Sequence, residues 1–309
     1  MSENNVNTAN TANAAPAASK PKKLKRHFWL WPLLIGFALT ILGQIIGDVT
    51  VLPFEHIFDI PEMWQFSLQY FSFYGIILVV LGFCALCEKP IFKTFLPEGK
   101  GGLKNNTVKD FFIGVLFGFI MNGSCILIAW LHGDLHFSIG EFLPVYLIVT
   151  FICVTIQSSA EEMITRGYIY QAHAERYPIW FALIGNSLLF GALHLGNEGI
   201  TVISFVELFM SGFALSLVVY ARKSVWFAYG CHTMWNFTQS IIFGLPNSGI
   251  VSKGSFLHLD AASGSFCYDP VFGVEGTIFS VLSEFLVIGW CIWLIMKDKK
   301  KKSVKNTAA

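Results

Sequence analysis

Eight long apolar stretches constrain this chain more than any other feature of its sequence. The hydrocarbon core of a bilayer is about 30 Å thick, so a helix needs about 20 apolar residues to cross it. Charged residues make up only 13% of the 309 residues, about half of the roughly 25% typical of a soluble domain. The sequence therefore predicts an all-α, multi-pass bundle of about eight transmembrane helices rather than a soluble enzyme. The stretches lie at roughly 28–48, 63–86, 111–131, 143–160 and onward, 179–195, 203–220, 225–244 and 277–296.

The distribution of positive charge predicts how these helices are oriented. Cytoplasmic loops of membrane proteins are enriched in Lys and Arg. With eight alternating helices and both termini in the cytoplasm, every Lys and Arg except Lys253 falls on the cytoplasmic side. An odd number of helices would place the two terminal basic clusters on opposite sides. We therefore expect both termini to be cytoplasmic, in a protein of the cell membrane whose surroundings are the lipid bilayer.

The same arguments divide the chain into three parts. Residues 1–26 are polar, end in a basic cluster and hold too few large apolar residues to bury a core, so we expect a disordered tail. Residues 27–297 form one membrane-embedded domain, and 298–309 form a basic C-terminal tail. The net charge is only +1, and without a basic field no nucleic-acid partner is expected.

A group of ionisable residues ends the fourth apolar stretch. Such residues are costly inside a membrane, and they therefore suggest function. Glu162 can pair with Arg166 one helical turn later. This pairing explains one carboxylate and leaves its neighbour Glu161 unexplained. Two other carboxylates in apolar stretches, Glu207 and Glu284, are expected to form hydrogen bonds between helices.

Two histidines lie in later apolar stretches. His194 ends the fifth stretch, and His232 lies in the seventh, one turn before Asn236. If the fourth helix continues beyond the membrane and turns at Pro178, Glu161 and His194 reach the same depth in an antiparallel hairpin. His232 enters from the same side. We therefore expect these polar groups to lie in one layer and to supply each other with polar partners.

These residues resemble the motifs of a known family. The chain holds, in order and on successive predicted helices, Glu161-Glu162-x-x-x-Arg166, Phe190-x-x-x-His194 and His232-x-x-x-Asn236. They are similar to the three motifs of the CPBP family, the CAAX-processing and bacteriocin-processing intramembrane proteases, also called the Abi family. The resemblance covers residues 143–240. It implies an eight-helix bundle that cleaves a membrane-associated peptide or protein at a site open to the cytoplasm.

Peptide hydrolysis suggests a role for each residue. The reaction needs an activated water, a group that stabilises the oxyanion and an acid for the leaving amine. Glu161, which matches the first Glu of the family motif, is the predicted general base. We expect His194 and His232 to position the water, and Asn236 to stabilise the oxyanion. Glu162 and Arg166 are expected to hold these catalytic residues in place without touching the substrate.

The sequence leaves the cofactor open. Two His and one Glu are the ligands of many catalytic zinc sites, so Glu161, His194 and His232 could hold a divalent metal such as zinc. The usual H-E-x-x-H helix is absent, and Glu161 cannot easily be both ligand and base. Members of the family are described both as metalloproteases and as metal-independent glutamate proteases. We favour a metal-free mechanism in which Glu161 activates water.

Two other functions are compatible with the same residues. A non-catalytic scaffold or immunity protein of this fold would bind a peptide partner in the cavity. A proton-coupled transporter would use Glu161, His194 and His232 as a relay, although the sequence lacks the internal repeats of many transporters. The substrate of a protease is equally open, since a prenylated CAAX peptide, a leader peptide and another membrane protein all fit.

Overall fold

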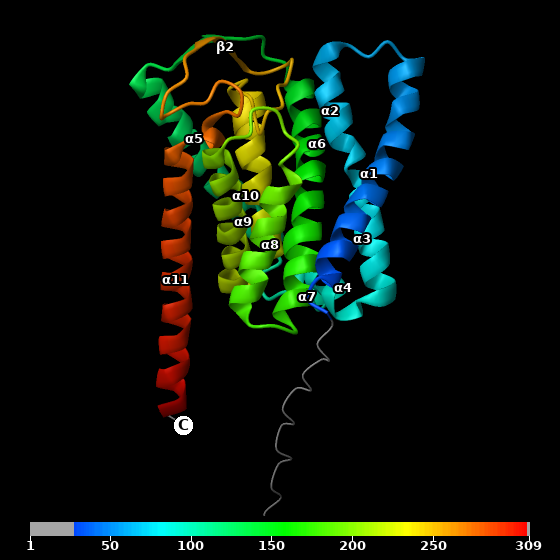
Figure 1. Ribbon diagram of the computed structural model, residues 1–309, viewed down its shortest axis with the longest axis vertical. Coiled ribbons are helices and arrows are strands. Elements are labelled where there is room, and N and C mark those ends of the chain that lie inside the picture. Colours follow the sequence, from blue (N-terminus) through cyan, green and yellow to red (C-terminus); the bar gives the residue numbers. More distant parts are fainter. Residues whose placement is uncertain (1–27, 308–309) are drawn as a thin grey trace, which may run out of the picture.

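The computed structural model of the protein describes residues 28–307, so the predicted disorder of residues 1–26 lies outside the described residues. Most of the described chain is helical, and the long helices run side by side in one bundle (Figure 1). The elements of the first half are α1 (Trp31–Ile57), α2 (Glu62–Ser72), α3 (Tyr74–Cys87), α4 (Lys89–Phe95), η1 (Glu98–Lys100), α5 (Val108–His132) and β1 (Leu135–Ile139).

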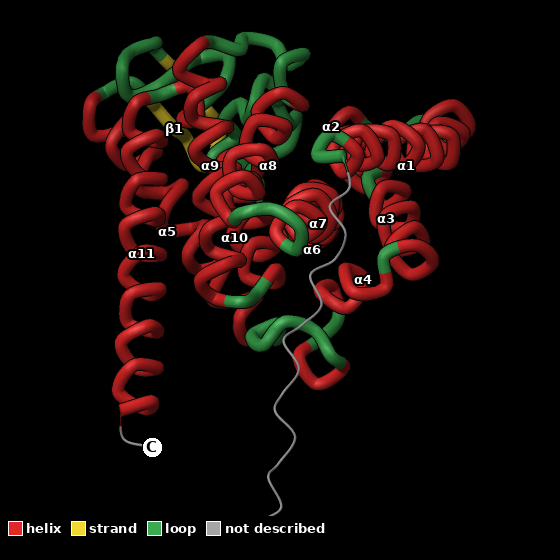
Figure 2. Tube along the Cα trace, turned by 60° about the horizontal axis from the view of Figure 1, so that its bottom comes forward, coloured by secondary structure: helices red, strands yellow, loops and turns green. Residues whose placement is uncertain are grey.

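The second half carries the predicted motifs. It consists of α6 (Pro144–Glu162), the π-helical segment η2 (Met163–Ile169), α7 (Tyr170–Ala174), α8 (Ile179–Leu193), α9 (Val202–Arg222), α10 (Val225–Phe237), the π-helical segment η3 (Thr238–Ile242), β2 (Leu257–Ala262), η4 (Val274–Gly276) and α11 (Ile278–Thr307). The basic C-terminal segment therefore continues α11 as far as the described residues extend. Figure 2 shows α6 and α7 between the N-terminal helices α1–α4 and the remaining helices.

All eight predicted apolar stretches are helical. In the described part of the chain, six helices are long and apolar enough to cross a membrane: Trp31–Phe54, Glu62–Cys87, Val108–His132, Pro144–Ala174, Val202–Arg222 and Ile278–Val304. The two other stretches form α8, which has 15 residues, and α10 with η3. Helix α1 begins and α11 ends at the same end of the bundle (Figure 1). This arrangement fits an even number of crossings, while the count of eight and the cytoplasmic placement stay predictions.

The hairpin expected around Pro178 is present. The fourth apolar stretch continues without interruption from Pro144 to Ala174, and α8 begins directly after Pro178. The φ of this proline is −57°, which suits the start of a helix, where a missing backbone N–H costs little. The last turns of α6 and the end of α8 therefore lie at similar heights in an antiparallel pair.

Glycines fix the position of α10 against α5. Gly114 and Gly118 of α5 face backbone atoms of α10, Cys231 among them, and Gly230 of α10 faces the backbone of α5 in return. A Cβ atom at any of these glycines would overlap that backbone. Small residues of this kind let membrane helices approach closely. The contact therefore sets the height of His232, which follows Cys231.

A small sheet is the departure from the all-α prediction. Strands β1 and β2 pair antiparallel, from Leu135 opposite Ala262 to Ile139 opposite Leu257. They lie among loops at one end of the bundle (Figure 2). Leu135 and Phe137 alternate with outward-facing residues and pack on α5 and α10, where they cover apolar side chains such as Ile126. This alternation spans only five residues, which is too short to be distinguished from a loop in the sequence.

Candidate active site

The structure brings the six predicted site residues into one region of the bundle. A cavity of about 490 Å³ lies between the helices that carry the three motifs, and residues of α1, α2, α5, α9 and α11 also line it. Four of the six line this cavity, and the other two lie behind its wall, where their side chains are not exposed. The lining residues are Glu161, His194, His232 and Asn236, and the two behind them are Glu162 and Arg166.

Glu162 binds two cationic or potentially cationic side chains. Arg166 Nη1 lies 2.7 Å from Glu162 Oε1, which is the i,i+4 pair predicted from the sequence. The same oxygen accepts a hydrogen bond from His232 Nδ1 at 3.0 Å. The Arg166 guanidinium also lies 4.3 Å from the centroid of the Phe190 ring. Glu162 therefore joins the first and third motifs, and Arg166 joins the first and second.

Glu161 points into the cavity. Its side chain is 21% exposed, and its Oε2 lies 3.7 Å from His232 Nε2. The other carboxylate oxygen, Oε1, accepts a hydrogen bond from Gln157 Nε2 at 2.7 Å. The partner that sequence reasoning did not find for Glu161 is thus Gln157, one helical turn earlier on the same face of α6.

Asn236 connects this network to a loop. Its Nδ2 donates to Gln157 Oε1 at 3.2 Å and to Ser158 Oγ at 3.4 Å. Its Oδ1 accepts from Asn247 Nδ2 at 3.2 Å. A chain of amides therefore runs from Asn247 through Asn236 and Gln157 to Glu161, and it orients the carboxylate that faces the cavity.

Both histidines have their Nδ1 atoms occupied. His232 Nδ1 bonds the Glu162 carboxylate, and His194 Nδ1 lies 2.8 Å from the backbone oxygen of Phe190. These oxygens are acceptors, so each Nδ1 carries the hydrogen. In the neutral ring the lone pair then lies on Nε2. Each histidine can accept a hydrogen bond or bind a metal through Nε2.

The side chains that could bind zinc are present in the cavity, but their donor atoms do not all lie close together. Glu161, His194 and His232 offer one oxygen and two nitrogens, and the hydrogen bonds at both Nδ1 atoms are of the kind that orients metal-binding histidines. Within residues 28–307, however, these three do not form a group of donor atoms that all lie within 4.8 Å of one another. These residue types are suited to binding a metal ion, but their positions in this structure do not fit one.

The loop between η3 and α11 supplies cavity residues that the sequence did not reveal. Asn247, Ser248 and Glu275 line the cavity. Glu275 accepts hydrogen bonds from Trp235 Nε1 at 2.7 Å and from Ser248 Oγ at 2.5 Å. Burial raises the pKa of Glu275, and the hydrogen bonds from Ser248 and Trp235 oppose part of that rise. The loop has no periodic pattern, so its sequence carries no signal for this position.

Two further carboxylates, on α9 and α11, line the cavity. Glu207 of α9 accepts a hydrogen bond from Ser280 Oγ of α11 at 3.0 Å, as expected for a polar residue between helices. Glu284 of α11 also lines the cavity. Both are buried. The cavity therefore has a strongly acidic polar lining within otherwise apolar walls.

A π-helical segment overlaps the first motif, and another follows the third. Segment η2 begins directly after Glu162, and all seven of its residues are buried. Segment η3 begins two residues after Asn236. Short π-helical segments are rare and occur frequently at functional sites. Their wider turns change the direction of the side chains at the ends of both motifs.

Among known proteins, one family matches the part of the chain that carries the three motifs. Residues 140–238 match the family described as type II CAAX prenyl endopeptidase Rce1-like. The match covers about a third of the chain, includes all three motifs and confirms the predicted CAAX protease family. With the apolar helices, it supports a hydrolase of the multi-pass membrane type. No match was found among curated proteins or among solved structures.

Proposed function

We propose that this chain is a CAAX-type intramembrane endopeptidase that cleaves a membrane-associated peptide or protein in a cavity facing the cytoplasm. The observation that carries the proposal is the placement of His232, whose two ring nitrogens approach Glu162 and Glu161 at 3.0 and 3.7 Å beside a cavity of about 490 Å³. The family match over the same helices supports the reaction class.

Glu161 is the proposed general base. The 3.7 Å between Glu161 Oε2 and His232 Nε2 is too long for a direct hydrogen bond. A water at this position can donate one hydrogen to each of the two atoms. Its oxygen attacks the carbonyl carbon of the substrate while Glu161 takes the proton. The C–N bond then breaks, and the proton passes from Glu161 to the leaving amine.

Asn236 is the proposed oxyanion donor. Its contact with Ser158 Oγ is long, at 3.4 Å, so this amide hydrogen can be redirected to the carbonyl oxygen of a bound substrate. Such a donor is worth about 10²–10³ in rate. His194, held through Nδ1, would orient the water or the peptide from α8.

The mechanism requires no step through a metal. A divalent cation such as zinc would be held by Glu161, His194 and His232 and would act as a Lewis acid on the carbonyl oxygen. The separation of these donors favours the metal-free alternative. In that alternative the carboxylate of Glu161 remains available as the base.

The test is cleavage by the purified full-length protein. A farnesylated peptide with a CAAX terminus and its unmodified counterpart are the substrates, in lipid vesicles. Glu161→Gln should lower cleavage about 10²–10⁴-fold, and His194→Ala and His232→Ala should also lower it strongly. Glu141→Gln, an exposed loop carboxylate, is the matched control.

Each result has a consequence. Full activity of Glu161→Gln would overturn the proposed base. Peptide binding without cleavage by the wild type would favour the scaffold alternative. A proton-coupled flux abolished by the same three substitutions would favour the transporter.

A further inference from the structure

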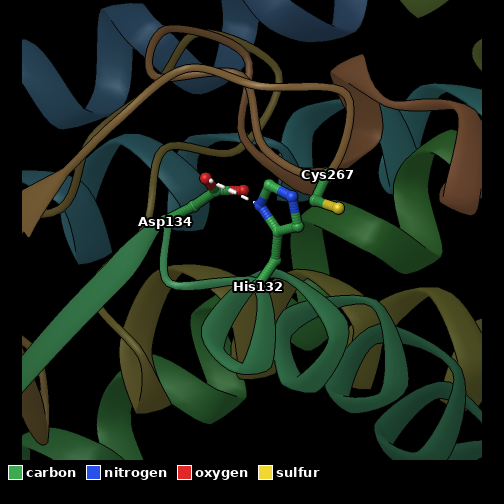
Figure 3. A group of neighbouring side chains, drawn as sticks. All are labelled: His132, Asp134 and Cys267. Carbon is green, nitrogen blue, oxygen red and sulfur yellow. Dashed lines mark hydrogen bonds and ion pairs between the residues drawn. The ribbon is translucent and has the colours of Figure 1, made fainter.

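A second group of metal-binding side chains lies outside the cavity, at the end of the bundle that carries the sheet. His132 ends α5, Asp134 follows in the turn into β1, and Cys267 lies in the loop after β2 (Figure 3). One donor atom from each of the three lies within 4.8 Å of the other two. Among residues 28–307, this is the one group of His, Cys, Asp or Glu side chains whose donor atoms lie this close together.

A tight turn brings the first two ligands together. Gly133 has a φ of +92°, a left-handed conformation that favours glycine, and ends α5. The chain reverses its direction at once, so His132 and Asp134 point toward each other. Their Nδ1 and Oδ1 atoms are 3.1 Å apart (Figure 3).

The third ligand is held by hydrogen bonds to the second. Ser265 Oγ donates to Asp134 Oδ2 at 2.5 Å and accepts from the backbone N–H of Cys267 at 2.8 Å. The backbone N–H of Ser263 also donates to the backbone oxygen of Asp134 at 3.0 Å. Asp134 is therefore the anchor of this loop, and the hydroxyl of Ser265 binds Oδ2 and leaves Oδ1 to face His132.

The donor set indicates which ions fit. Cys267 and Asp134 are 2% and 5% exposed, so a thiol and a carboxylate are buried side by side. Thiolate and imidazole ligands select zinc-class transition metals over Ca²⁺ and Mg²⁺. Zinc binds such atoms at about 2.0–2.3 Å, so the group must contract by about an ångström. The His132 side chain is 41% exposed, and its ring packs edge-on against Phe266 with centroids 4.8 Å apart, so the two rings would shift together.

We propose that His132, Asp134 and Cys267 bind a zinc-class divalent ion that fastens the loop after β2 to the end of α5. The hydroxyl of Ser265 orients the carboxylate from outside the coordination sphere, as outer hydrogen bonds do in known sites. Water fills the fourth tetrahedral position. The ion would also stabilise the segment that continues to Glu275 and the cavity.

Cobalt binding tests this proposal. Co²⁺ replaces zinc, and a coordinating thiolate gives a charge-transfer absorption that Glu161, His194 and His232 cannot produce. The full-length protein in detergent should show this band at one ion per chain. Cys267→Ser should abolish the band, and Cys87→Ser, which removes an exposed thiol elsewhere, should keep it. Absence of the band in the wild type would overturn the proposal.

Two further variants separate this site from others. His132→Ala should weaken Co²⁺ binding by about tenfold or more, whereas His136→Ala, an exposed neighbour on β1, should not. Both side chains are exposed, so this pair stays informative even if Cys267→Ser does not fold. Glu161→Gln should keep the band. Equal binding by the His132 and His136 variants would overturn the assignment.

Discussion

Two histidine–carboxylate contacts of almost equal length lie in very different parts of this molecule. His232 Nδ1 is 3.0 Å from Glu162 Oε1 in the middle of the bundle, and His132 Nδ1 is 3.1 Å from Asp134 Oδ1 at its end. The His232 side chain is 11% exposed, and that of His132 is 41% exposed. The distance between the atoms therefore does not distinguish the two contacts. The surroundings of each contact distinguish them instead.

The difference lies in what balances the negative charge. Glu162 is paired with the fixed cation of Arg166, and neither side chain is exposed. Asp134 is held instead by a neutral hydroxyl and lies beside the buried thiol of Cys267. A carboxylate that already has a protein cation orients a histidine. One that lacks such a cation is suited to bind an ion from solution.

The largest expected effect comes from removing the protein cation. Arg166→Met leaves Glu162 buried without its partner, which should cost about 3–5 kcal/mol of unfolding free energy. Lys302→Met is the control, since Lys302 and Asp298 form a pair of the same spacing with side chains 75% and 66% exposed. Thermal unfolding in detergent measures both. Equal stability of the two variants would remove the proposed contrast between the two contacts.

The second effect separates the roles of the two carboxylates. Glu162→Gln removes the charge that orients His232 and should lower cleavage about 10–100-fold, as loss of an outer partner does in other sites. Asp134→Asn should leave cleavage unchanged and reduce Co²⁺ binding. Rates with a farnesylated CAAX peptide and the cobalt absorption are the two measurements. A similar fall in cleavage for both variants would show that the two regions are not independent.

A third buried carboxylate gives a smaller, pH-dependent effect. Glu275 is held by the neutral donors Trp235 and Ser248, and burial raises its pKa in the folded state. The folded state therefore prefers the protonated form. The resulting stabilisation is present below the unfolded pKa of about 4.3 and is lost as the pH rises through the folded value.

Glu275→Gln tests this dependence because glutamine does not titrate. The unfolding midpoint of the wild type should fall relative to that of the variant as the pH is raised from about 4 to 8. Glu198→Gln, an exposed carboxylate, provides the control. A midpoint difference that is constant with pH would mean that Glu275 keeps one protonation state over this range.

The smallest expected effect is that of chelation on cleavage. Exhaustive chelation should remove the ion bound by His132 and its partners, because the 41% exposed side chain of His132 opens the site to solvent. Cleavage should be retained if Glu161 activates water without a metal. Metal content and peptide cleavage are measured on the same sample. Loss of cleavage that zinc restores in Cys267→Ser as well as in the wild type would assign a metal to Glu161, His194 and His232.

The sequence was sufficient for the helices and for most of the cavity site. Glu161, His194 and His232 stand out because ionisable groups are costly in apolar stretches, and the turn at Pro178 places the first two at matching depth. The π-helical turns after Glu162 could not be predicted, because apolar periodicity does not register one additional residue in a buried helix.

The loop contributions could not be predicted for a different reason. Asn247 and Glu275 reach the cavity through contacts between distant segments. His132 and Cys267 are likewise separated by more than a hundred residues and approach only in three dimensions. A single sequence contains no local pattern that pairs such positions. His132 therefore had no predicted role.

The glycine contact between α5 and α10 has a consequence for genetics. Gly114 and Gly118 lie on α5, which carries none of the motif residues, yet any side chain added there pushes against the backbone of α10. The histidine beside Cys231 would then move relative to Glu161. A random mutagenesis screen for loss of cleavage should thus recover substitutions in α5 that change no charge and touch no substrate.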